Sequence, residues 1–211
     1  MTAKAADAGS PWPLWLLRHG TPVETGVLLG WTDAPLSGKG VQEAEAQAGR
    51  LAQQGIRRII TSDLTRCRET AAVIETHLAV PVLDDARWRE MNFGRWDGLA
   101  PNAIPQDSLS RFQTDPDLYP PPGGERWQDL RLRVGKTLEA LEPQPTLIVA
   151  HGGSIRAALS ILLGWTLDHC WTLDHCWAVD LPYGVLVRLN LWETQPRTAQ
   201  LTGLFRVEDG L

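Results

Sequence analysis

Two apolar runs that each end in His-Gly constrain this chain more than any other feature. Residues 14–17 lead into Arg18, His19 and Gly20, and residues 146–150 lead into His151 and two glycines. Apolar runs of this length are typical of buried strands in a parallel sheet. Because ligands bind beyond the carboxyl ends of such strands, we expect two imidazoles to face one crevice.

The segments between and after these runs alternate between helix and strand patterns. Ser37 is predicted to cap a helix with an apolar stripe of Val41, Ala44, Ala48 and Leu51. Further helices are expected to start at Ser62 and to cover residues 127–141 and 154–163, and further strands to cover residues 56–60, 80–83, 177–180 and 184–192. This alternation predicts a three-layer α/β fold, with a mostly parallel sheet and helices on both faces.

The length and composition predict one domain over residues 14–211, after a flexible lead-in of residues 1–13. Residues 97–124 are expected to form a small, partly helical lid over the site. A net charge of −5 argues against binding to nucleic acid or to acidic membranes, and no stretch is apolar enough to cross a bilayer. Three cysteines and no signal-like segment favour the cytoplasm.

A six-residue segment, 165–170, is repeated without change as residues 171–176. Because six is even, an extended chain keeps its faces in register across the duplication, whereas a helix turns by about 240°. We therefore expect a long connection there, which would allow the Trp177 segment to be exchanged between the subunits of a homodimer. Its histidines and cysteines lack the paired spacing of a structural zinc site, so no metal is expected.

The residues at the two strand ends indicate phosphoryl transfer. A neutral His19 can attack phosphorus with one ring nitrogen while the other donates to a backbone carbonyl. Arg18 and one arginine of the second helix would neutralise the phosphate oxygens, but helical spacing does not choose between Arg66 and Arg68. His151 would add a donor, and Gly20, Thr21 and Gly152 complete the expected phosphate-binding set.

Breaking a phosphate ester also requires a proton for the leaving oxygen. Glu90 is the candidate, because Trp88, Met91 and Phe93 flank it and would partly desolvate it. Desolvation raises the pKa of a carboxyl group and keeps part of it protonated near neutrality. An ordinary loop glutamate is an equally good interpretation of the residues alone.

Four motifs occur in the order that is found in the histidine phosphatase superfamily. They are residues 17–20 (LRHG), 62–71 (SDLTRCRETA), 90–98 (EMNFGRWDG) and 151–156 (HGGSIR). The resemblance covers roughly residues 14–192 and implies a phosphoglycerate mutase-like fold. It also implies His19 as nucleophile, Glu90 as proton donor and Arg66 as the second-helix arginine, with no metal or cofactor.

Within that superfamily, residues 30–37 (GWTDAPLS) and 121–125 (PPGGE) resemble α-ribazole phosphatases. This resemblance implies a small-molecule substrate, α-ribazole 5′-phosphate or the late cobalamin phosphate. A phosphoglycerate mutase or a broad-specificity phosphatase of the same fold is the alternative. A catalytically dead phospho-ligand binder is a further alternative, although such a protein would be expected to lack His19 or Glu90.

Overall fold

The computed structural model describes residues 9–165 and 179–209, and the named strands in that part of the chain form one six-stranded sheet. They are β1 (Trp12–Arg18), β2 (Arg58–Thr61), β3 (Val82–Asp84), β4 (Thr146–Ala150), β5 (Leu186–Trp192) and β6 (Thr198–Phe205). The order is β3-β2-β4-β1-β5-β6. The first four neighbours run parallel, whereas β5 is antiparallel to β1 and β6 is antiparallel to β5.

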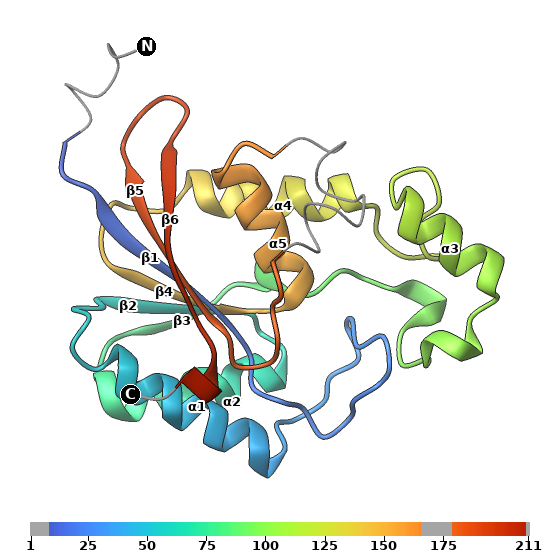
Figure 1. Cartoon of the computed structure of the whole chain (residues 1–211), viewed down its shortest axis with the longest axis horizontal. Coiled ribbons are helices and arrows are strands. Elements are labelled where there is room, and N and C mark those ends of the chain that lie inside the picture. The colour runs from blue at the N-terminus through green and yellow to red at the C-terminus, as the bar shows by residue number, and fades with distance from the viewer. Residues whose placement is uncertain (1–8, 166–178, 210–211) are drawn as a thin grey trace.

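Helices cover both faces of this sheet (Figure 1). They are α1 (Gly38–Leu51), α2 (Thr65–Leu78), α3 (Gln106–Thr114), α4 (Trp127–Glu139) and α5 (Gly152–Leu162). α1 and α2 pack on one face and α4 and α5 on the other, so each face has its own hydrophobic core. The predicted three-layer α/β fold is confirmed.

β1 shows why a central strand of this fold has a continuous apolar run. Leu14 and Leu16 pack into the core under α4 and α5, while Trp15 and Leu17 pack into the core under α1 and α2. Successive side chains of a strand point to opposite faces, and here both faces are covered. All four side chains are therefore almost fully buried.

Part of the polar surface of α1 faces the loop that follows β1. Ser37 caps the helix as predicted, because its Oγ accepts the N–H of Gly40 at 3.1 Å. Ala44, Ala48 and Leu51 are buried, but the prediction for Val41 is wrong, since it is 39% exposed. The first turns face the loop after β1 with Gly40 and Glu43 instead, and both are buried.

Several predicted boundaries are wrong by one to three residues, and two of these differences have a visible cause. β1 begins at Trp12, inside the expected lead-in, because Trp12 pairs with Leu191 and its Nε1–H donates to Glu193 at 3.2 Å. α2 begins at Thr65 rather than at Ser62, because the carboxylate of Asp33 accepts the N–H of Thr65 at 2.7 Å. Residues 1–8 of the expected lead-in lie outside the described residues.

The carboxyl-terminal part differs more from the prediction. Val179 and Asp180 are not in a strand, and residues 166–178, which include the duplicated hexapeptide and the rest of the Trp177 segment, lie outside the described residues. The sequence analysis missed β6, whose mixed polar composition follows from its place at the sheet edge. The extended connection and the homodimer stay predictions.

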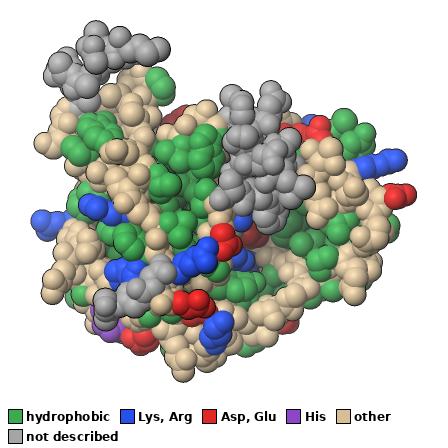
Figure 2. Space-filling model, in the orientation of Figure 1, with side chains coloured by type: hydrophobic (Ala, Val, Ile, Leu, Met, Phe, Trp, Pro, Cys, Tyr) green, Lys and Arg blue, Asp and Glu red, His purple; other side chains and the backbone are tan. Residues whose placement is uncertain are grey.

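Charges of both signs are interspersed on the face of the molecule shown in Figure 2. Within residues 9–165 and 179–209, no helix has the length and apolar character needed to cross a bilayer. In the same part of the chain, no three His, Cys, Asp or Glu side chains gather closely enough to hold a metal ion.

Candidate active site

A cavity of about 500 Å³ opens beyond the carboxyl ends of β1 and β4. Arg18 and His19 from the end of β1, Glu90, and Gly152 at the start of α5 all line it. The segment 97–124, which was expected to act as a lid, contributes Pro101, Leu109, Phe112 and Gln113 to its walls. The structure therefore brings four of the predicted site residues to one cavity.

His19 is held as a neutral imidazole at the base of this cavity. Its ring is almost fully buried, and its Nδ1–H donates to the Gly20 carbonyl at 2.8 Å, so that Nε2 keeps its lone pair. Burial lowers the pKa of His19 well below its usual value of about 6.5, and the charges of Arg66 and Arg18 lower it further. A buried neutral imidazole with one committed nitrogen is suited to nucleophilic attack.

Arg18 lies beside His19. One of its N–H donors is hydrogen-bonded to a carbonyl, and another has no partner among the described residues. Its Nη1–H donates to the Leu181 carbonyl at 2.5 Å, and its guanidinium carbon lies 4.0 Å from the centre of the Tyr183 ring. Its Nε–H is buried and has no hydrogen-bond partner among the described residues. Buried donors are almost always paired, so this atom indicates an anion-binding position.

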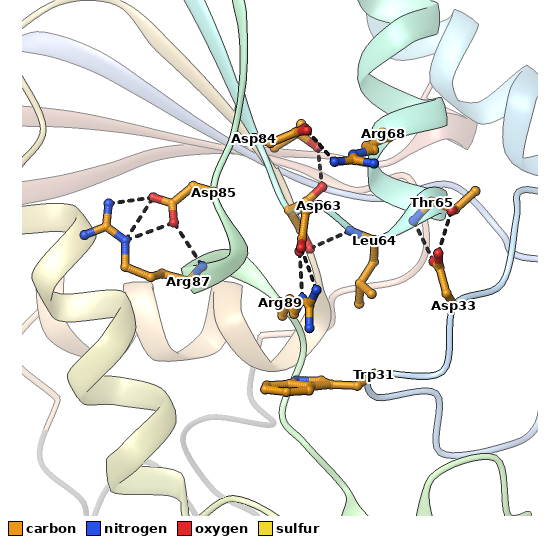
Figure 3. A network of polar contacts seen from close by, with 12 residues as sticks. Trp31, Asp33, Asp63, Leu64, Thr65, Arg68, Asp84, Asp85, Arg87 and Arg89 are labelled. Atoms are coloured by element: carbon orange, nitrogen blue, oxygen red, sulfur yellow. Dashed lines mark hydrogen bonds and ion pairs between the residues drawn. The ribbon is translucent and has the colours of Figure 1, made fainter.

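Arg66 also has a buried Nε–H without a partner in the described part of the chain, although Arg66 is not among the residues that line the cavity. Its side chain is completely buried, and its Nη atoms donate to the carbonyls of Thr32 at 2.9 Å and Gly30 at 2.7 Å. Arg68 does not line the cavity either; its side chain is exposed and forms an ion pair with Asp84 at 2.5 Å (Figure 3).

His151 lies against His19, although it is not among the residues that line the cavity. The two ring centres are 5.0 Å apart in an edge-to-face arrangement. Nε2 of His151 lies 2.9 Å from Oγ of Ser62, and burial together with the charge of Arg66 lowers the pKa of His151 well below its usual value. His151 therefore packs against the ring of His19. Direct contact of His151 with a phosphate stays a prediction.

Glu90 faces the cavity from the loop after β3. Its Oε1 accepts the N–H of Met91 at 2.8 Å, and its Oε2 accepts the N–H of Gly153 at 3.0 Å. A Cβ at Gly153 would collide with the carboxylate, so a side chain there would displace Glu90 from this position. Gly153 is the second of the two glycines that follow His151 in the sequence, and its N–H binds Glu90.

Arg133 of α4 is a residue that the sequence did not predict for the site. Its guanidinium donates to the Arg89 carbonyl at 2.8 Å and to the Glu90 carbonyl at 2.8 Å. It also forms a two-pronged ion pair with Glu125, with contacts of 2.7 and 2.9 Å. Arg133 thereby fixes the backbone on which Glu90 stands. No local pattern in the sequence pairs these segments.

Besides Arg66 and His151, two more residues of the predicted phosphate-binding set, Gly20 and Thr21, are not among those that line the cavity. A Cβ at Gly20 would collide with the Gly40 carbonyl, so this glycine permits contact with α1 rather than with a ligand. The N–H and hydroxyl of Thr21 both donate to Glu43, at 2.6 and 2.9 Å. We therefore leave Gly20 and Thr21 out of the phosphate-binding set.

The segment of residues 30–33, which follows the cavity-lining residues 27–29, is fixed to its surroundings mainly through backbone groups. The Asp97 carboxylate accepts the N–H groups of Gly30, Trp31 and Thr32 at 2.7–3.0 Å. Asp33 binds the N-terminus of α2, and the guanidinium of Arg89, which is paired with Asp63, lies 4.9 Å from the Trp31 ring (Figure 3). These contacts present the Gly30 and Thr32 carbonyls to Arg66.

Comparison with known proteins assigns the chain to a family. Its residues 14–200 match the family model of the histidine phosphatase superfamily (branch 1). A protein of Serratia proteamaculans named "Probable phosphoglycerate mutase" is 32% identical over 163 residues, which cover 72% of this chain and 74% of that protein.

Solved structures agree with this assignment. One titled "Mycobacterial hydrolase 2" superposes with a TM-score of 0.81 at 25% identity and covers 92% of this chain and 90% of that one. A mycobacterial glucosyl-3-phosphoglycerate phosphatase superposes with a TM-score of 0.78 at 27% identity and covers 90% and 97% of the two chains. The matched model spans both His-Gly strand ends and the Glu90 loop, so this chain belongs to the histidine phosphatase superfamily.

Proposed function

We propose that this protein hydrolyses phosphate monoesters of small molecules through a phosphohistidine on His19. The observation that carries this proposal is the state of that imidazole, which is neutral, faces the cavity and has its Nδ1–H bound to the Gly20 carbonyl. Nε2 attacks phosphorus, the N–P bond forms and the ester P–O bond breaks. Water then attacks the phosphohistidine and releases inorganic phosphate.

The transferred group carries negative charge, and the donors near His19 match that charge. The Nε–H groups of Arg18 and Arg66 have no partner among the described residues, and both guanidinium groups are close enough to lower the pKa of His19. The N-terminus of α5 at Gly152 adds the positive end of a helix dipole to the same cavity. Two guanidinium groups and a helix start can stabilise the charge that develops on the equatorial oxygens.

Glu90 is the proposed proton donor to the leaving oxygen. Its carboxyl group lines the same cavity as His19, next to the mostly apolar wall that would hold the organic part of the ester. After giving up its proton, the carboxylate is stabilised by the N–H groups of Met91 and Gly153. In the second step the same carboxylate accepts a proton from the attacking water.

The finer proposal is that the substrate is α-ribazole 5′-phosphate. Besides Arg18 and Arg156, the cavity lining contains the apolar side chains of Leu28, Met91, Phe93, Phe112 and Trp127. Such a wall suits a flat, apolar base better than the small, charged phosphoglycerates, because burying a carboxylate there would cost free energy.

Phosphoglycerate mutase is the second candidate, favoured by the name of the Serratia relative. A mutase must return the phosphoryl group to a second substrate instead of giving it to water. Mutase activity that is stimulated by 2,3-bisphosphoglycerate would decide for this candidate.

A turnover screen with the purified protein tests these proposals together. α-Ribazole 5′-phosphate, sugar phosphates, nucleotides and phosphoglycerates are compared by phosphate release, and rapid quenching tests for an acid-labile phosphoryl group on His19. We expect phosphate release by the wild type and none by His19→Ala. Binding of phosphate esters without turnover of any of them would refute the hydrolase and favour a phospho-ligand binder.

A further inference from the structure

The loop that carries His19 is fastened to the start of α1 by a series of short contacts. The Thr21 carbonyl accepts the N–H of Ser37 at 2.9 Å and its hydroxyl at 2.8 Å. Gly20 meets Gly40 so closely that neither position has room for a side chain. Glu43, one turn further along α1, binds both the N–H and the hydroxyl of Thr21. The loop is thereby held at three successive points of the helix.

One of these contacts leads directly to the nucleophile. The Gly20 carbonyl that accepts Nδ1–H of His19 belongs to the same peptide unit as the Thr21 N–H that donates to Glu43 at 2.6 Å. In a planar trans peptide the C=O and N–H groups point in opposite directions. A carboxylate at one end of this unit and an imidazole at the other are therefore linked through a single rigid group.

The packing of this loop does not require a charged side chain at Glu43. Its residue is only 6% exposed, and its nearest cation is the exposed Lys39 at 3.5 Å. A neutral glutamine oxygen could accept the same Thr21 N–H. This hydrogen bond alone therefore does not explain why a charged side chain is buried in this position. Other charged groups beside it line the adjoining cavity of about 340 Å³, namely Asp180, Arg206 and Glu208.

The environment of His19 supplies that reason. Arg18 and Arg66 attract the phosphate, but their charges also oppose any positive charge on the imidazole, and His151 behind it is neutral. Attack by Nε2 puts positive charge on the ring. A carboxylate at the N–H end of a peptide makes its carbonyl oxygen more negative, because hydrogen bonds in a chain polarise one another. The hydrogen bond to Nδ1–H then becomes stronger as the ring becomes charged.

We infer that Glu43 is a positioning residue for the nucleophile, because it orients and polarises the Gly20–Thr21 peptide whose carbonyl holds Nδ1–H of His19. This inference rests on the proposed phosphohistidine chemistry. It adds Glu43 to the imidazole and the Gly20–Thr21 peptide as a third group involved in the attack. Glu43 acts only through that peptide and touches no substrate. Its charge favours attack by Nε2 without bringing an anion into the phosphate-binding cavity.

Glu43→Gln tests the inference, because it keeps the shape and one acceptor oxygen but removes the charge. Glu45→Gln is the matched control, since Glu45 lies on the same helix and pairs with the exposed His77 instead. We expect Glu43→Gln to lower the rate of enzyme phosphorylation about tenfold, with little change in melting temperature. This is the loss typical of residues that orient a metal-binding histidine through its second ring nitrogen. Glu45→Gln should leave both unchanged.

Two further readouts distinguish polarisation from support of the fold. Removing the negative charge disfavours the imidazolium, so the acid limb of kcat/KM should move to lower pH in Glu43→Gln. In proton NMR of histidine-labelled protein, the Nδ1–H resonance of His19, assigned with His19→Ala, should move upfield in Glu43→Gln only. Full activity, an unmoved acid limb and an unmoved resonance in Glu43→Gln would overturn the inference. If no phosphate ester is turned over, the proposed function fails, while the resonance still decides whether Glu43 acts on His19.

Discussion

Replacing Arg66 with alanine removes a guanidinium that the structure places wholly inside the protein next to His19. A hydrogen bond to a charged group contributes about 2 kcal/mol, which corresponds to about 30-fold in kcat/KM for one lost contact with phosphate. The carbonyls of Gly30 and Thr32 also lose their donor, so the segment next to the cavity-lining residues 27–29 loosens and the loss should exceed this value. The change is measured as kcat/KM for one ester, well below the melting temperature of the variant.

The pH profile gives this prediction a second, independent readout. The charge of Arg66 lowers the pKa of His19, because it disfavours the imidazolium. Without Arg66 that pKa rises towards its usual value of about 6.5, so the acid limb of kcat/KM should move to higher pH. Arg68→Ala, which removes an exposed side chain paired with Asp84, is the matched control. Equal losses in the two variants, or an acid limb that stays in place in Arg66→Ala, would refute the reasoning.

Three further predictions concern the proton donor, the two imidazoles and the core. Glu90→Gln should slow hydrolysis strongly for an alkyl ester and much less for a nitrophenyl ester that leaves without a proton; equal slowing of both esters shows that Glu90 is not the acid. Burial lowers the pKa values of His19 and His151, so the unfolded chain binds more protons and the free energy of unfolding should fall as pH drops below about 6.5. Urea titrations at several pH values check this, and stability that rises on acidification contradicts it. Leu16→Ala should lower the free energy of unfolding by about 2–5 kcal/mol, because Leu16 is fully buried in the centre of the sheet, and a loss below about 1 kcal/mol would show that the core closes around the deletion.

The sequence predicted the central part of the fold well because its strands are covered on both sides. The runs before His19 and His151 are buried on both faces, so, apart from Thr146 and Arg18 at their ends, their residues are apolar and the pattern is strong. β6 lies at an edge with one neighbour, and its mixed composition carries no comparable signal. The exposure of Val41 was missed because part of α1 packs against a loop rather than against the sheet.

The candidate site was predicted where the chemistry lies on a strand end and missed where it depends on distant contacts. Arg18, His19 and His151 lie next to the ends of β1 and β4, so their meeting follows from the sheet order. The role of Arg133 depends on carbonyls more than forty residues away, which no spacing rule connects. Arg156 also lines the cavity, and its place one helical turn after Gly152 is a signal that could have been used.

The way in which Arg66 and Asp97 hold residues 30–32, next to the cavity-lining residues 27–29, has an evolutionary consequence. Arg66 binds carbonyls and Asp97 binds N–H groups, so both contacts use main-chain atoms that every amino acid except proline possesses. Mutations that alter the neighbouring apolar side chains can therefore reshape the space for a new substrate without disturbing the arginine. Selection can therefore change which leaving group the cavity accepts, while the residues that transfer the phosphate stay the same.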